Sequence, residues 1–89
     1  MRAVISVIGK DTVGILAKVS NICADNNINI VDVTQSVLQD MFVMVMLAEI
    51  DKMSCSLSSL SETLGKMGSE MNLDIRVMHE DIFNSMHRI

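Results

Sequence analysis

The stretch GKDTVGIL, residues 9–16, joins a strand-like run to a helical pattern. The residues before it, Ala3 to Ile8, are β-rich and apolar on both faces, which predicts a central strand covered on both sides. From Val13 to about Asn26, apolar residues recur at i, i+3, i+4 and i+7, which predicts an amphipathic helix. The sequence therefore predicts a strand–turn–helix unit whose turn is bracketed by glycines.

Such a turn exposes backbone N–H groups that have no partner within the helix. With the positive end of the helix dipole, these donors favour an anionic group such as a carboxylate. Gly14 has no side chain, so a ligand or another chain can approach the backbone there. The alternative is that Asp11 or Thr12 is an ordinary N-cap and Gly14 only relieves packing. Because caps are much commoner than ligand-binding turns, the turn by itself favours this structural interpretation.

After this unit, the pattern predicts a hairpin of two strands. Asn26-Asn27 ends the helix, since asparagine tolerates the left-handed conformation that closes helices. The strand Ile28 to Leu38 has a slip in its apolar phase after Ile30, which indicates a β-bulge and an edge position. Gln39-Asp40 can form the turn, and Phe42 to Ile50, apolar on both faces, is the second central strand.

The last third of the chain predicts a helix, a strand and a second short helix. The first helix runs from Ser54 to about Met71, capped by Ser54, by Ser56 or by a Ser59-x-x-Glu62 capping box. The strand is Asp74 to Met78, and Glu80 to Ile89 carries an apolar stripe at helical spacing. A helix of that length is marginal alone, so the stripe must pack on something.

The element order β-α-β-β-α-β predicts an α+β, ferredoxin-like sandwich in one domain, residues 1–89, with residues 79–89 as a helical tail. Right-handed crossovers give a four-stranded antiparallel sheet with two helices on one face. The other face is bare in such a fold, yet both central strands carry apolar residues there. The C-terminal helix, a partner subunit or both should cover it.

Composition narrows the functional classes. The chain has 89 residues, 49% of them hydrophobic, which excludes a disordered chain, and its net charge of −4 argues against nucleic acid. Cys23 and Cys55 lack metal-type spacing and predict small buried thiols in a reducing compartment. The longest uncharged apolar run, Met41 to Ala48, is too short to span a bilayer, and no signal-peptide pattern is present, so we expect a cytoplasmic protein.

Two motifs resemble the ACT domain family. In that family a turn of the form D-x-x-G-[ILV]-[LV] follows the first strand, as in residues 11–16, and a G/N-x-N-I pattern opens the second strand, as in residues 27–30. The resemblance covers the whole chain. The tail, residues 79–89, is similar to that of small stand-alone ACT proteins of bacteria and archaea, which are functionally uncharacterised, and these are similar to the halves of the glycine-cleavage repressor.

The resemblance implies a regulatory module that binds an amino acid or another small metabolite between paired domains. The ligand-binding residues that it implies are the turn, Gly9, Lys10, Asp11, Thr12, Val13, Gly14 and Ile15, together with Asn29 from the neighbouring subunit. Serine sensors of the family carry asparagine where this chain has Asp11, and an ionised aspartate only accepts hydrogen bonds, which suits an ammonium group.

Two other classes compete with a sensor. One is a purely structural dimerisation module without a retained ligand site, which the apolar sheet faces and nine methionines favour. The other is an enzyme: acylphosphatases share this chain order but need an arginine in the first loop, and here the nearest following one is Arg76. His79 and His87 lack metal-pair spacing, so we expect no catalytic residue, metal or cofactor.

Overall fold

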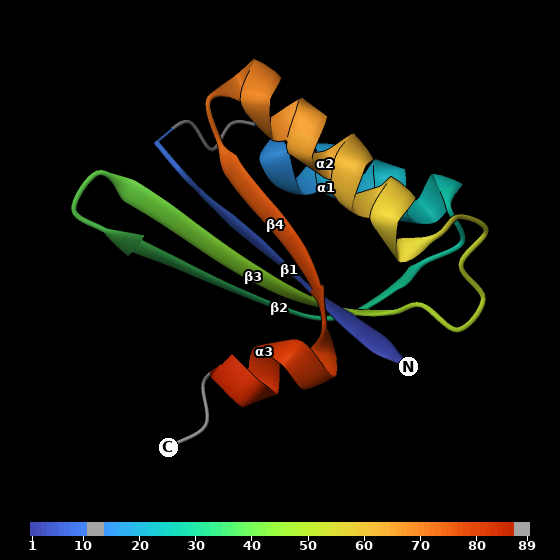
Figure 1. Ribbon diagram of the computed structural model, residues 1–89. Helices are drawn as coiled ribbons and strands as arrows, with labels where there is room; N and C mark the ends of the chain where they lie inside the picture. Colours follow the sequence, from blue (N-terminus) through green and yellow to red (C-terminus); the bar gives the residue numbers. More distant parts are fainter. Residues whose placement is uncertain (11–13, 87–89) are drawn as a thin grey trace.

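Two central strands, β1 (Arg2–Gly9) and β3 (Met41–Glu49), organise the computed structural model, which describes residues 1–10 and 14–86. They lie between β2 (Asn29–Leu38) and β4 (Asp74–His79) in an antiparallel sheet of order β2-β3-β1-β4. Figure 1 shows two helices on one face of the sheet and a third, shorter helix on the other. These helices are α1 (Ile15–Asp25), α2 (Leu57–Met71) and α3 (Glu80–Met86). The predicted ferredoxin-like sandwich is confirmed.

The core lies between the sheet and the pair α1 and α2. Alternate residues of the two central strands point to this face and are almost fully buried: Ala3, Ile5 and Val7 on β1, and Met44, Met46 and Ala48 on β3. From the helices, Ile15, Val19, Cys23, Leu60 and Leu64 complete the layer. The methionines of β3 supply the volume that aromatic residues provide in other small domains.

The start of α1 differs from the prediction. Its N-cap is Gly14, with φ 73° and no side-chain cap hydrogen bond, so the expectation that Asp11 or Thr12 caps the helix is wrong. Asp11, Thr12 and Val13 themselves lie outside the described residues. Gly14 does not relieve packing either, because a Cβ there would meet nothing within 4 Å. Its left-handed backbone is the reason for glycine at this position.

The β2–β3 hairpin agrees with the sequence pattern. The register between the two strands shifts between Ile30 and Asp32, which places a bulge at the predicted phase slip. Asn27 and Gln39, at the two ends of β2, adopt positive φ angles of 60° and 58°. β2 lies at the edge of the sheet, also as predicted.

The N-cap of α2 is Ser56, whose Oγ accepts a hydrogen bond from the Ser59 N–H at 3.1 Å. Of the three caps that the sequence allowed, this is the one used, and Ser59 lies inside the helix. Gly68 permits a close approach to β4, since a Cβ there would lie 2.8 Å from the carbonyl oxygen of Leu73. Gly65 has no such neighbour.

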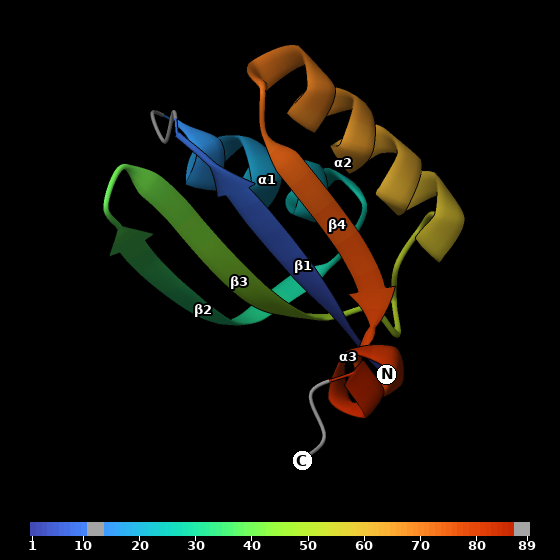
Figure 2. The same ribbon diagram turned by 60° about the vertical axis from the view of Figure 1, so that its left-hand side comes forward.

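The helix α3 crosses the open face of the sheet near the start of β1 (Figure 2). Arg2 on β1 pairs with Glu80 at the start of α3, with 2.9 Å between guanidinium nitrogen and carboxylate oxygen. Phe83 is half-buried, whereas Ile82 and Met86 remain 56% and 66% exposed. The chain's own sheet therefore covers only part of the predicted stripe, and Ile89 lies outside the described residues. In the part of the chain that the structure describes, no helix is long and apolar enough to cross a membrane.

Candidate ligand-binding site

Gly9 and Lys10, two of the predicted site residues, line a hollow of about 560 Å³ where β1 ends. Its walls come from three other segments: the end of α2, the start of β4 and the start of β3. Lys10 reaches Asp40 in the β2–β3 turn, with 3.5 Å between Nζ and Oδ2, and both side chains are largely exposed. The remaining lining residues are Ile8, Met41, Met71, Asn72 and Asp74. We call this the turn-end hollow.

The next predicted residues differ in what they can offer a ligand. The backbone at Gly14 is exposed, and its carbonyl accepts the Lys18 N–H of the first turn of α1 at 3.0 Å. The side chain of Ile15 is 1% exposed in the core, so this residue can present only backbone atoms. Asp11, Thr12 and Val13 are the predicted residues that fall outside the described ranges.

Asn29 lies at the opposite end of the sheet. The register pairs Asn29 with Glu49 and Glu49 with Arg2, whereas Gly9 pairs with Phe42 at the other end of β1. Gly9 lies seven residue steps along β1 from Arg2, or about 23 Å at roughly 3.3 Å per step. One chain alone therefore does not bring Asn29 to the turn-end hollow.

Asn29 lines a hollow of its own, of about 550 Å³. The N-terminal ammonium group of Met1 neutralises part of the negative charge at this end of the sheet. It lies 3.2 Å from Glu49 Oε1 and 2.8 Å from Asp51 Oδ1. These hydrogen bonds raise the pKa of the N-terminus and lower the pKa of Asp51. The other lining residues are Ala24, Asn27, Ile28, Glu49, Asp51 and Lys52. We call this the Asn29 hollow.

Sequence reasoning missed the walls of the turn-end hollow. Met71 and Asn72 end α2, and Asn72 closes that helix with φ 58°. Because β4 pairs with β1, the α2–β4 junction lies beside Gly9, where the Leu73 side chain leaves no room for a Cβ. The available signal was the predicted ferredoxin-like fold, in which the last strand pairs with the first and places this junction next to the end of β1.

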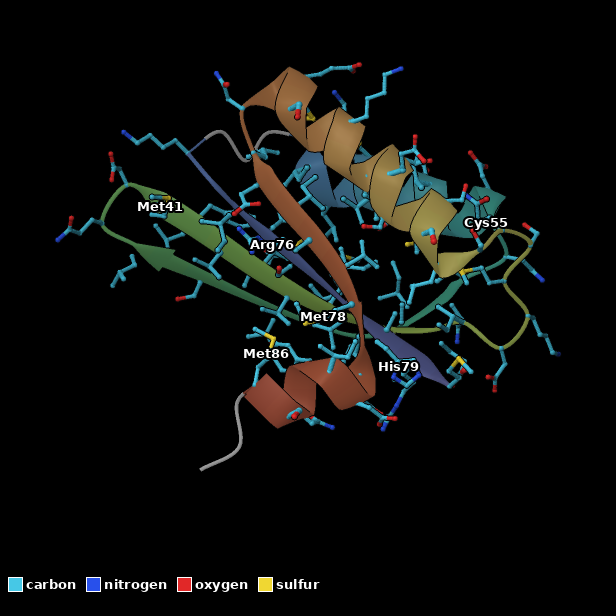
Figure 3. All side chains as sticks on the ribbon, in the orientation of Figure 1. Met41, Cys55, Arg76, Met78, His79 and Met86 are labelled. Carbon is cyan, nitrogen blue, oxygen red and sulfur yellow. The ribbon has the colours of Figure 1, made fainter. Side chains whose placement is uncertain are left out.

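The histidines and cysteines are the remaining residues that the sequence analysis considered for metal binding or catalysis. Residues 1–10 and 14–86 contain no cluster of three histidine, cysteine or acidic side chains that could hold a metal ion. His79 Nδ1 accepts the backbone N–H of Asp81 at 3.1 Å, next to α3 (Figure 3), and His87 lies outside the described residues. Both cysteines are free thiols.

Comparison with known proteins shows relatives of the same size. The chain is 48% identical over 89 residues to a UPF0237 protein of Clostridium perfringens, covering 100% of both chains. It is 46% identical over 88 residues to a UPF0237 protein of Methanopyrus kandleri, covering 99% of this chain and 98% of the relative. These relatives come from a bacterium and an archaeon, as the resemblance predicted.

Solved structures include proteins with the same fold. An ACT domain protein from Streptococcus pneumoniae superposes with a TM-score of 0.80 at 34% identity, covering 93% of each chain. A putative glycine cleavage system transcriptional repressor has the same fold, with a TM-score of 0.76 at 17% identity over 86% of this chain and 45% of the repressor.

A family model described as the ACT domain matches residues 2–78, which run from the start of β1 to the penultimate residue of β4 and leave out α3. ACT domains are regulatory modules that bind small ligands and typically form dimers. The chain belongs to the ACT domain family and, within it, to the small UPF0237 proteins.

Proposed function

We propose that this protein is a non-enzymatic cytoplasmic sensor that binds an amino acid, or a similar small metabolite, at the interface of a homodimer. Each of two symmetry-related sites combines the turn Gly9–Ile15 of one subunit with Asn29 of the partner subunit. The observation that supports this most strongly is the position of two hollows, each beside one half of the predicted site, at opposite ends of the sheet.

The edge strand β2 offers a simple way to join the two halves. Its outer side has no strand neighbour in the sheet, and its last residues, Val37 and Leu38, are 70% and 72% exposed. If two copies pair their β2 strands antiparallel over the full length, Asn29 of the partner subunit lies opposite Leu38. Leu38 is next to Val37, which pairs with Phe42, and Phe42 pairs with Gly9. The two half-sites then lie at the same end of the sheet, three strand spacings apart, or about 14 Å at roughly 4.8 Å each.

The chemistry of the two halves suits an amino acid. The first turn of α1 offers backbone N–H groups and a positive dipole to the ligand carboxylate. The Asn29 amide can donate and accept, and an ionised Asp11 accepts from the ammonium group. Lys10, although exposed and near Asp40, supplies a countercharge for the carboxylate at the rim.

Ligand binding would act through the pairing. A ligand held by both subunits stabilises the dimer, and the shift in population is limited by its difference in affinity for the two states. The consequence is a change in the amount of dimer, or in its affinity for a client protein.

Titration calorimetry against the twenty amino acids and common nucleotides tests this proposal. We expect at least one saturable ligand, whose binding is lost in Asn29→Ala and in Asp11→Ala while the dimer persists in ultracentrifugation. Asn21→Ala and Asp25→Ala, at exposed positions of α1, are matched controls that should bind as the native protein does. A folded dimer that binds nothing at millimolar concentration contradicts the sensor.

A structural dimerisation module is the second candidate, because Val37, Leu38 and Met41 are apolar and exposed at the hairpin end. Its signature is a dimer that Val37→Lys disrupts and that responds to no metabolite. The same titration therefore separates the two functions, since a sensor responds and a pairing module does not.

A further inference from the structure

A third cavity lies on the other side of the sheet from α1 and α2, between the sheet and α3, and the proposed sensor site does not use it. Its volume is about 240 Å³. Register places Val4, Leu47 and Asp32 in one row across β1, β3 and β2, and Val45 and Thr34 in the next row. From α3, Glu80, Phe83 and Asn84 complete the lining, to which Met46 also contributes. We call this the α3 cavity.

The α3 cavity has an apolar floor and a polar rim. Val4 is buried, Val45 and Leu47 are half-buried, and Phe83 forms the wall on the α3 side. These four side chains suit an apolar group, since the floor is already largely withdrawn from water. The rim consists of Asp32, Thr34, Glu80 and Asn84.

The two carboxylates on the rim have different partners. Glu80 is paired with Arg2, at 2.9 Å. Asp32 Oδ1 accepts the backbone N–H of Val33 at 2.9 Å, and no lysine, arginine or histidine of residues 1–10 and 14–86 forms an ion pair with Asp32. Among the described residues, no basic side chain lines the cavity. The rim that these residues form is therefore net acidic, and Asp32 can accept a hydrogen bond from a ligand cation.

We infer that the α3 cavity binds a small organic amine, an ammonium group on an apolar body. The apolar body contacts Val45, Leu47 and Phe83, while the ammonium group lies near Asp32 and the hydroxyl or amide oxygens of Thr34 and Asn84. A carboxylate-bearing ligand is disfavoured, because its charge would face Asp32 and Glu80. The cavity thus selects amines against the zwitterionic amino acids that we propose for the turn.

Size limits the ligand further. A volume of 240 Å³ equals that of about eight water molecules at roughly 30 Å³ each. That volume is below the range of about 300–1,000 Å³ typical of drug-sized ligands, so the ligand is a simple alkyl or arylalkyl amine.

The experiment is a titration of the ¹⁵N-labelled full-length protein, followed by NMR at pH 7, with three matched compounds: phenethylamine, phenylalanine and 2-phenylethanol. The amine keeps the apolar body and the charge, phenylalanine adds a carboxylate, and the alcohol removes the charge. We expect saturable shifts with the amine, at the amides of residues 32, 45, 47 and 83. The other two compounds should bind at least threefold more weakly.

Variants test whether the carboxylate of Asp32 binds the ammonium group of the amine. Asp32→Asn keeps the side-chain oxygen that accepts from Val33 but removes the charge, and it should weaken amine binding about threefold to fivefold, as for a partly exposed ion pair. Asp25→Asn, an exposed carboxylate on α1, is the matched control and should change nothing. Asn29→Ala should also leave amine binding intact, so failure of the sensor proposal and failure of this one are distinguishable.

Three results would overturn the inference: equal binding of the alcohol and the amine, unchanged affinity in Asp32→Asn, or shifts that map to Gly9, Lys10 and Asn29 instead. The inference would also be overturned if phenethylamine at millimolar concentration produced no saturable shift.

Discussion

The two faces of the sheet differ in burial although the same two strands supply them. On the face toward α1 and α2, Val7, Met44 and Met46 are fully buried. On the face toward α3, Ile8 and Met41 are 39% and 38% exposed. The face toward α3 also carries Arg2, Ser6 and Glu49, but its other side chains on β1 and β3 are apolar, so composition alone does not explain the difference.

The lengths of the helices explain this difference in burial. The helices α1 and α2 have 11 and 15 residues, whereas α3 has seven and is about 10 Å long at 1.5 Å per residue. That helix contacts β1 and β4, and Met41 at the hairpin end and Met86 at the end of α3 both remain exposed (Figure 3). One face is thus the core, and the other keeps the cavity and the apolar surface that a ligand or partner can use.

The largest expected effect comes from a pair of methionine substitutions on β3, which compares the two faces of the sheet. Met46→Ala, in the covered face, should lower the free energy of unfolding by about 2–5 kcal/mol, since it leaves a cavity in a packed layer. Met41→Ala, on the open face of the same strand, should cost less than about 1 kcal/mol. Urea denaturation measures both, and equal losses would show that the open face is also packed.

A second pair tests how tightly α2 packs on the sheet. Gly68→Ala should destabilise by about 1–3 kcal/mol, because the new Cβ would approach the backbone oxygen of Leu73 and the side chain of Ile75. Gly65→Ala, with no atom within 4 Å of the new Cβ, should stabilise by about 0.5–1 kcal/mol. The opposite signs should appear as opposite shifts in Tm. Two shifts of the same sign would contradict close packing at Gly68.

Phe83→Ala tests the α3 layer. The side chain is half-buried, so we expect a loss of about 1–2 kcal/mol, below the roughly 3–5 kcal/mol of a fully buried phenylalanine. Denaturation measures the loss, and hydrogen exchange should show faster exchange confined to residues 80–86. A loss as large as that of Met46→Ala would mean that α3 belongs to the core.

The smallest effect concerns pH. Burial, with a smaller contribution from the nearby Cys55, raises the pKa of the Cys23 thiol. The unfolded chain then loses this proton first, so stability is fully present below the unfolded pKa and falls as the pH rises above about 8.5. Unfolding of native protein and Cys23→Ala, measured from pH 7 to 10, should show a steeper decline in the native protein. Parallel curves would contradict a raised pKa.

Most of the fold was predictable because it follows from local rules. The phase slip after Ile30 predicted the bulge, and the apolar alternation in residues 42–50 predicted a central strand, since strand period is a property of the backbone. The cap of α1 was not predictable by the same rules. Ser, Thr and Asp are the usual caps and form the cap with a side-chain oxygen. Gly14 caps the helix through a left-handed backbone conformation instead, and no side-chain pattern indicates that conformation.

The candidate site was predictable only in part. Gly9 and Lys10 were proposed as ligand-binding residues from the family resemblance, and both line a hollow whose walls come from the α2–β4 junction, which is distant in sequence. The pairing of Asn29 with the turn remains a prediction, as do the roles of Asp11, Thr12 and Val13.

By itself, the sequence determined the element order, the edge position of β2 and the family, because periodicity, turn chemistry and motif spacing are written along the chain. Only the tertiary structure decided which apolar face became the core, how little of the other face α3 covers, and where cavities remain. The physical reason is that burial depends on how far each helix extends over the sheet, and neighbouring residues along the chain do not carry that information.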